Sequence, residues 1–262
     1  MQVEEQLNVS LTDDKFQNWF EQKIALSDPW YKLILKMLKP VTGFEGKRVL
    51  EVGCGLGVFC IHIAKEHGEA IGLDISKSAI LKAKELTRRY GVQDKVEFVV
   101  SDARFLPFVD RSEDIIVSSE TLEHIQNHEK AFHEFARITD NSGYICLTVP
   151  NLISSLFFEY VFFMVMGQPK YVKKFLNVEK EYVFHYFKVK RLVNSESLSI
   201  IDIKGTDYVH LHPKITRFFR LDNLVKLVSN ELEGKKSWRF LGANIGVIAQ
   251  KTAFDRSEGL HS

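Results

Sequence analysis

Short apolar runs alternate with amphipathic segments along the middle of the chain. The runs are each short enough for a buried strand, and they cover 48–52, 69–73, 95–100, 113–118 and 144–149. Between them, Ser76 can cap one amphipathic helix, and a second helix is predicted over 128–139. Strands and helices that alternate with short connections predict an α/β fold with a parallel, doubly wound sheet.

A glycine-rich turn follows the first apolar run. Residues 48–57 read Arg-Val-Leu-Glu-Val-Gly-Cys-Gly-Leu-Gly, so Gly53, Gly55 and Gly57 alternate with larger residues. Glycine has no Cβ atom, so it adopts positive φ and lets the backbone approach a ligand to contact distance. The turn also opens a helix whose free N–H groups face the loop. We interpret this stretch as a cradle for a small molecule.

Acidic residues follow several of the predicted strands. Asp74 ends the second strand, where a carboxylate can accept hydrogen bonds from the two vicinal hydroxyls of a ribose. Gly53, Asp102 and Glu120 also follow strand ends. Because the carboxyl ends of parallel strands meet at one edge of a sheet, these residues are expected to converge there. The pattern indicates a cofactor that contains a nucleoside.

The spacing of the glycines argues against a dinucleotide. The dinucleotide fingerprint is G-x-G-x-x-G, whereas this turn reads G-x-G-x-G and is preceded by Glu51. An acid beside the cradle would repel a diphosphate and would suit a cationic ligand. A nicotinamide-dependent oxidoreductase remains an alternative, but that class explains neither Glu51 nor Asp102.

Four stretches together resemble the motifs of the class I S-adenosylmethionine-dependent methyltransferases. They are the turn at 50–57, Asp74, the run 101–103 and the run 120–125, in the family's order. The small-molecule enzymes of quinone biosynthesis are similar members. The resemblance implies a Rossmann-like, doubly wound seven-stranded sheet with a reversed last hairpin. We expect that fold here, with an N-terminal helical cap and a lid inserted after the fifth strand.

The patterns also divide the chain into parts. We expect a helical cap over 1–46, a methyltransferase core over 47–150 and 185–252, a substrate-covering insertion over 151–184 and a flexible tail over 253–262. Within the cap, Pro29 suits the first turn of a helix that ends before Pro40. Beyond the insertion, a helix, a strand, a helix and a final strand are predicted over 187–194, 198–206, 215–228 and 238–250.

The resemblance implies S-adenosylmethionine as the cofactor, S-adenosylhomocysteine as its product and a role for each site residue. The backbone of the turn would hold the methionine part, Asp74 the ribose, Ile75 the face of the adenine, and Asp102 with the Ala103 amide its edge. The whole expected set is Glu51, Gly53, Gly55, Gly57, Asp74, Ile75, Asp102, Ala103 and Glu120. Two structural alternatives remain: Asp102 as a cap of the following turn, and Glu51 as a partner of the loop's own amides.

Two histidines are candidates for a general base. Methyl transfer is an in-line displacement, and a hydroxyl acceptor must lose its proton. His185 lies in an aromatic run and resembles the His-x-Phe that follows the covering segment in the family; it can also be a helix cap. His124 is spaced to join Glu120 and Glu123 on one helical turn. A structural role for His124 and a divalent metal at that set are alternatives, but we expect no metal.

Composition limits the kinds of partner and the cellular compartment that we expect for this protein. The formal net charge of +1 argues against nucleic-acid binding by bulk electrostatics. The three cysteines, Cys54, Cys60 and Cys146, have no metal-type spacing and are expected to be reduced packing residues of a cytoplasmic protein. The start of the chain does not read as a signal peptide, and the apolar stretch 152–167 is interrupted by Glu159.

An aromatic run followed by a basic run lies within 157–191. The aromatic side chains suit an apolar acceptor, and the lysines and arginines suit a phosphate or an anionic membrane surface. We therefore expect O-methylation of an apolar, lipid-linked or anionic small molecule, with peripheral membrane contact through 157–191. The alternative is a non-catalytic protein that binds an adenosyl cofactor and uses its lid as a partner or membrane surface.

Overall fold

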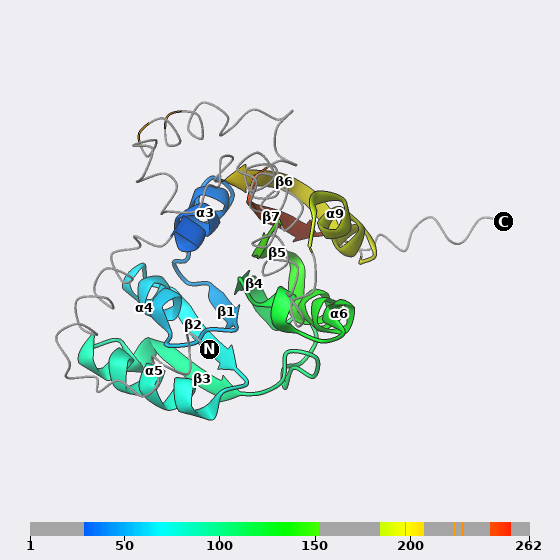
Figure 1. The fold of residues 1–262 in the computed structure, drawn as a ribbon. Helices are drawn as coiled ribbons and strands as arrows, with labels where there is room; N and C mark the ends of the chain where they lie inside the picture. The colour runs from blue at the N-terminus through cyan, green and yellow to red at the C-terminus, as the bar shows by residue number, and fades with distance from the viewer. Residues whose placement is uncertain are drawn as a thin grey trace, which may run out of the picture.

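Seven strands form one sheet in the computed structural model, which describes residues 29–151, 184–196, 198–206 and 242–252 and the single positions 223 and 227. The strands are β1 (Arg48–Val52), β2 (Glu69–Asp74), β3 (Val96–Val100), β4 (Glu113–Ser119), β5 (Thr139–Pro150), β6 (Leu198–Thr206) and β7 (Asn244–Lys251). Their order across the sheet is β3-β2-β1-β4-β5-β7-β6 (Figure 1).

The direction of the strands reverses only near one edge. β1 pairs in parallel with β2 and β4, and β3 and β5 continue the parallel arrangement outward. β7 runs antiparallel to both of its neighbours, β5 and β6. This order and the reversed last hairpin confirm the predicted seven-stranded Rossmann-like sheet.

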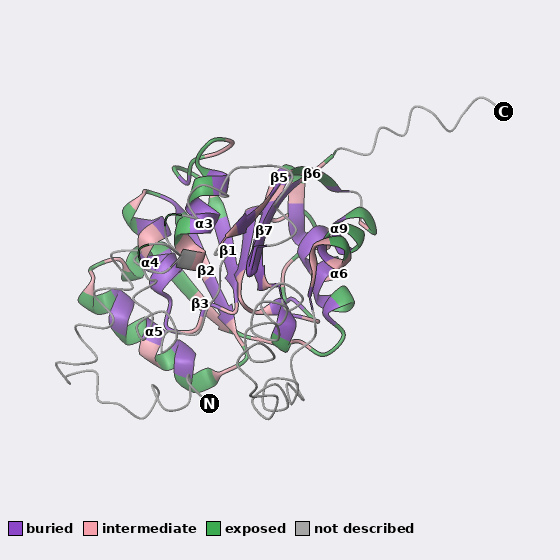
Figure 2. Ribbon diagram, turned by 45° about the horizontal axis from the view of Figure 1, so that its top comes forward, coloured by how far each residue is buried: buried purple, intermediate pink, exposed green. Residues whose placement is uncertain are grey.

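The helices of the described ranges cover both faces of the sheet. They are α3 (Pro29–Leu38), α4 (Val58–Lys65), α5 (Lys77–Arg89), α6 (His128–Ile138) and α9 (Tyr186–Asn194), with single turns η1 (Gln93–Lys95) and η2 (Leu122–His124). One apolar cluster joins α3, α4 and α5 to the sheet, and another joins α6 and α9 to its opposite face (Figure 1). Figure 2 shows the central strands buried between these two layers.

Buried strands explain why the sequence shows apolar runs rather than strict alternation. In β1, Val49 packs in the cluster of α3 and α4, while Leu50 and Val52 pack in the cluster of α6. Successive side chains of a strand point to opposite faces, and here both faces are covered.

Local capping fixes where several helices begin. Ser76 caps α5 through a hydrogen bond from the Ala79 N–H to Ser76 Oγ at 3.3 Å, as predicted. Asn127 caps α6, and His185 caps α9. The predicted helix over 128–139 ends one residue earlier, because Thr139 is extended and opens β5, five residues before the predicted start of that strand.

Several expectations lie outside the described residues. They are most of the cap (1–28), nearly all of the insertion (152–183), the helix over 215–228 apart from positions 223 and 227, and the tail (253–262). Within the described ranges, no helix is long and apolar enough to cross a membrane.

Candidate cofactor site

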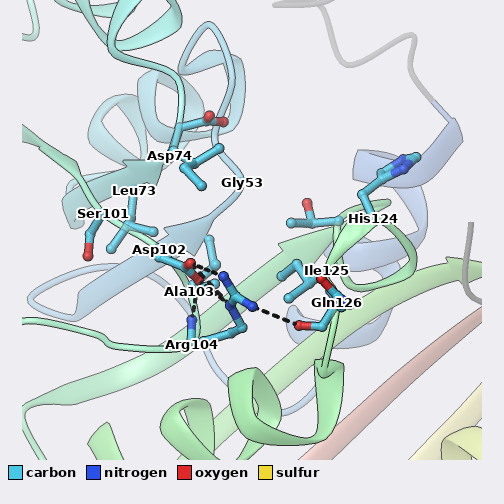
Figure 3. Close-up of a pocket in the computed structure, with 13 residues that line it drawn as sticks. Gly53, Leu73, Asp74, Ser101, Asp102, Ala103, Arg104, His124, Ile125 and Gln126 are labelled. Atoms are coloured by element: carbon cyan, nitrogen blue, oxygen red, sulfur yellow. Dashed lines mark hydrogen bonds and ion pairs between the residues drawn. The ribbon is translucent and has the colours of Figure 1, made fainter. Parts of the chain in front are cut away.

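A pocket of about 310 Å³ opens at the carboxyl ends of the parallel strands. Its lining comes from the ends of β1, β2 and β3 and from the segment after β4; the residues are Val52, Gly53, Leu73, Asp74, Ile75, Ser101, Asp102, Ala103, Arg104, Thr121, His124, Ile125 and Gln126 (Figure 3). Open α/β sheets bind ligands at this edge. Of the expected residues, Gly53, Asp74, Ile75, Asp102, Ala103 and His124 are therefore brought together.

The three glycines of the turn all have positive φ, but they do different work. Gly53 lines the pocket, and a Cβ atom there would collide with the side chain of Thr121. At Gly55, a Cβ atom would meet no described atom within 4 Å. At Gly57 it would lie 2.8 Å from Phe98, away from the pocket. Gly57 therefore lets α4 pack closely on β3, which is a structural task.

Asp74 ties the end of β2 to the glycine turn. Its Oδ2 accepts the Gly55 N–H at 2.9 Å, and its Oδ1 accepts the Ser76 N–H at 2.8 Å. A carboxylate offers about four acceptor positions, so each oxygen keeps one position for a ligand. Two vicinal hydroxyls could be accepted there without loss of either backbone bond.

Asp102 is held by Arg104, two residues further on. Asp102 Oδ1 accepts the backbone N–H and Nε of Arg104 at 2.9 and 3.0 Å, and Oδ2 accepts Nε and Nη2 at 3.1 and 2.6 Å. These hydrogen bonds to Arg104 hold the pKa of the Asp102 carboxyl below its usual value. The same guanidinium donates from Nη1 to the carbonyl oxygen of Gln126 at 3.4 Å (Figure 3).

Glu51 lies outside the pocket lining, although the sequence placed it in the cofactor set. Its side chain is 1% exposed and lies between α3 and α4, where it accepts hydrogen bonds from Tyr31 Oη at 3.3 Å and Cys60 Sγ at 3.1 Å. Burial raises the pKa of the Glu51 carboxyl to about 8, so it is mostly protonated at neutral pH. Its partners are the side chains of Tyr31 and Cys60 and the backbone of Cys60, which belong to helices rather than to the loop.

Gly55, Glu120 and His185, which the sequence also predicted for the site, lie outside the lining as well. Glu120 has φ +48°, and its backbone N–H donates to the Thr148 carbonyl oxygen at 3.0 Å. His185 begins α9, and its Nδ1 accepts the Lys188 N–H at 3.3 Å. Since His185 is not among the lining residues, the structure favours the helix-cap interpretation for it.

His124 is the one base candidate that lines the pocket. It ends the single turn η2, and its side chain is 57% exposed. Its Nε2 lies 3.9 Å from Oε1 of Glu123, which is buried. The described part of the chain contains no group of three histidine, cysteine or acidic side chains that could hold a metal ion.

Sequence reasoning missed Arg104, Thr121 and Gln126 as lining residues. An arginine two positions after Asp102 was a visible signal, because an aspartate side chain commonly bonds the backbone two residues on. Thr121 and Gln126 carried no such signal, since their places depend on how the segment after β4 folds back to the end of β1.

A match to the methyltransferase domain family covers residues 43–198, well over half of the chain. The protein therefore belongs to that family. The sheet order and the pocket at the strand ends agree with it and define a class I S-adenosylmethionine-dependent methyltransferase fold. Family and fold together imply S-adenosylmethionine as the cofactor.

Matches to individual curated proteins cover a smaller part of the chain than the family match does. Norajmaline N-methyltransferase of Rauvolfia serpentina is 36% identical over 93 residues, which are 35% of this chain and 32% of that protein. Methyltransferase GfsG of Streptomyces halstedii is 25% identical over 150 residues, 56% of this chain and 54% of that protein. The matches thus span about a third to a half of these curated relatives.

The fold is also found among solved structures. A SAM-dependent methyltransferase from Aquifex aeolicus superposes with a TM-score of 0.54 and 18% identity, covering 88% of this chain and 98% of that one. At this identity the likeness supports the fold alone.

Proposed function

We propose that this protein is an S-adenosylmethionine-dependent methyltransferase that acts on a small molecule. The observation that carries the proposal is one pocket, lined by Gly53, Asp74 and Asp102, at the carboxyl ends of β1, β2 and β3. Family membership supplies the reaction class, and this geometry supplies a site for it.

The residues of the pocket fit most of the cofactor. Asp74 keeps acceptor positions for two ribose hydroxyls, and Ile75 offers an apolar side chain that is 72% exposed. The open surface at Gly55 leaves room beside the turn, whose carbonyl oxygens can accept hydrogen bonds from an ammonium group. At the adenine end, a base amino group would share the Asp102 carboxylate with Arg104, which already donates to both of its oxygens.

When bound, the cofactor would supply an activated methyl group with a neutral leaving group. The protein's own contribution would be to align the acceptor, exclude water and take up a proton. Support for His124 in the last task is that the residue lines the pocket, that its side chain is 57% exposed and that its Nε2 lies 3.9 Å from Oε1 of the buried Glu123. We propose His124 as the general base for a hydroxyl acceptor, and hence O-methylation.

N-methylation is the second candidate. Two curated relatives are N-methyltransferases, named for norajmaline and ajmaline. Both candidates share the cofactor pocket and differ only in the acceptor atom, so product analysis after turnover with labelled cofactor separates them. A non-catalytic adenosyl-binding protein would bind the cofactor without turnover.

The acceptor is proposed to be apolar or lipid-linked, with contact at a membrane surface. Support comes from α9, where Phe187 is 67% exposed and Lys190 and Arg191 are also exposed. Exposed aromatic and cationic side chains favour the boundary of an anionic bilayer.

Thermal unfolding with S-adenosylhomocysteine, S-adenosylmethionine and NADH tests the cofactor. A ligand at about 100 times its dissociation constant adds about 2.7 kcal/mol of stability, which raises Tm by several degrees. We expect a shift with the two adenosyl compounds in the wild-type protein and none in Asp74→Ala. A shift with NADH alone, or none with any ligand, would contradict the proposed function.

A further inference from the structure

Three N–H groups of Arg104 donate to the carboxylate that the cofactor site needs at its adenine end, and the single N–H on Nε is shared between the two oxygens. Asp102 receives hydrogen-bond contacts at 2.9 and 3.0 Å on Oδ1 and at 3.1 and 2.6 Å on Oδ2. A carboxylate has about four acceptor positions. An amino group of a bound base therefore meets a carboxylate on which Arg104 already holds most of these positions.

Arg104 also bridges the two walls of the pocket. Asp102 and Arg104 follow β3, whereas Gln126 precedes α6, and the guanidinium contacts both segments (Figure 3). We call this arrangement the Arg104 strap: Asp102, Arg104 and the carbonyl oxygen of Gln126. All three residues line the pocket.

The strap is suited to being displaced. The Arg104 and Asp102 side chains are 33% and 27% exposed, so water screens the pair and replaces its hydrogen bonds when it opens. Besides the Arg104 hydrogen bonds, the nearby positive charge of Lys130 makes a smaller contribution that also lowers the pKa of the Asp102 carboxyl. The hold on Gln126 is long, at 3.4 Å.

We propose that Arg104 competes with the 6-amino group of the bound adenine for Asp102, and so lowers the preference of the pocket for an aminopurine. This inference rests on the proposed function, since it concerns the same cofactor site. It makes Arg104 a specificity-determining residue that acts through Asp102. Binding of a 6-aminopurine opens the strap, whereas a purine without that amino group leaves it in place.

Calorimetric titration tests the competition without any turnover. The probes are S-adenosylhomocysteine and its analogue that lacks the 6-amino group, titrated into the wild-type protein, Arg104→Met and the control Arg88→Met. Arg88 is exposed on α5 and does not line this pocket. Methionine keeps an unbranched apolar stem like that of arginine but has no N–H donor.

Arg104→Met is expected to bind S-adenosylhomocysteine about three- to tenfold more tightly than the wild-type protein, and the analogue with unchanged affinity. The ratio of the dissociation constant of the analogue to that of S-adenosylhomocysteine therefore rises. In the background Asp102→Ala, the same Arg104→Met change is expected to leave the ratio as it is, because the shared partner is gone. Arg88→Met is expected to match the wild-type protein in both titrations.

Three results overturn the inference while leaving the proposed function intact. One is that the wild-type protein binds S-adenosylhomocysteine but Arg104→Met does not raise the ratio of the two dissociation constants. Another is equal weakening of both ligands, which assigns Arg104 a structural role. The third is the same change of ratio in the Asp102→Ala background, which means that Arg104 acts on the ligand directly. Failure of the wild-type protein to bind S-adenosylhomocysteine overturns the proposed function itself, and the inference with it.

Discussion

Gly55 and Gly57 lie two residues apart in the same turn and both have positive φ, yet a methyl group at each would meet different surroundings. Gly57→Ala would drive a Cβ atom to 2.8 Å from Phe98, whereas Gly55→Ala meets no described atom within 4 Å. We expect Gly57→Ala to lower the free energy of unfolding by about 2–4 kcal/mol and Gly55→Ala by about 1 kcal/mol.

Urea denaturation of both variants checks this difference, with S-adenosylhomocysteine binding as the second readout. Gly55→Ala is expected to weaken binding, because the methyl group would stand in the open space beside the glycine turn, although the fold survives. Equal losses of stability would show that Gly57 is not packed against β3.

The buried carboxyl of Glu51 is expected to give the protein an unusual dependence of stability on pH. Burial raises the pKa of its carboxyl from the ordinary 4.5 to about 8, so the folded protein holds a proton that the unfolded chain releases. The unfolded state is then favoured increasingly as pH rises from 4.5 to 8, and stability is lost across that window. Glu51→Gln keeps the shape without the ionisation.

The difference in unfolding free energy between Glu51→Gln and the wild-type protein is therefore expected to grow by about 3 kcal/mol in favour of the variant from pH 5 to pH 8. Urea titrations at both pH values measure it. Glu85→Gln, at an exposed position of α5, is the matched control and should show no such trend. A constant difference would mean that Glu51 is ionised in the folded protein.

At the scale of elements, the end of α6 depends on a lysine from the last strand. Lys251 Nζ donates to the carbonyl oxygens of Ala136, Arg137 and Thr139 at 2.7, 3.3 and 2.7 Å. These carbonyls lie where the helix no longer supplies N–H donors. The contact joins β7, the reversed strand, to a helix more than a hundred residues earlier in the chain.

Lys251→Met is expected to destabilise the protein by about 1–3 kcal/mol, because it removes a charged donor from partly buried carbonyl groups. Urea denaturation measures the loss, and Lys95→Met, at an exposed position, serves as the control. If both variants lost the same small amount, the cap would contribute nothing beyond an ordinary surface lysine.

At the scale of the whole molecule, the proposed membrane contact would turn the surface that carries α9 toward the bilayer. The triple change Phe187→Ser, Lys190→Glu and Arg191→Glu removes an exposed aromatic ring and reverses two charges. We expect it to reduce pelleting with vesicles rich in anionic lipid by at least about thirtyfold, since each of the two lost cations contributes about 1 kcal/mol and about 1.4 kcal/mol is tenfold.

Lys84→Glu with Arg88→Glu makes the same change of net charge on α5, across the sheet from α9, and is expected to pellet much as the wild-type protein does. Neutral vesicles should pellet neither variant. Loss of binding in the α5 variant as well would indicate attraction by net charge alone, without a defined surface.

Periodicity predicted most of the sheet because each strand carries its own evidence. The strand predicted over 198–206 coincides with β6, and the predicted strand over 113–118 is one residue shorter than β4. Thr139 marks a boundary that periodicity did not predict. Its hydroxyl donates to the Phe135 carbonyl oxygen at 2.6 Å while its backbone already pairs with β4, so a residue of helical pattern became the first of a strand.

The amino-acid sequence by itself determined the succession of strands and helices, the positive-φ turn and the placement of Asp74 and Asp102 at one edge of the sheet. These features depend on local periodicity, on glycine's missing side chain and on the parallel direction of neighbouring strands. Only the tertiary structure decided which face Glu51 points to, because both faces of β1 are buried and an apolar run does not distinguish them. Only it showed that Gly57 packs against Phe98 and that Arg104 reaches the carbonyl oxygen of Gln126, since those contacts join segments whose approach no short pattern encodes.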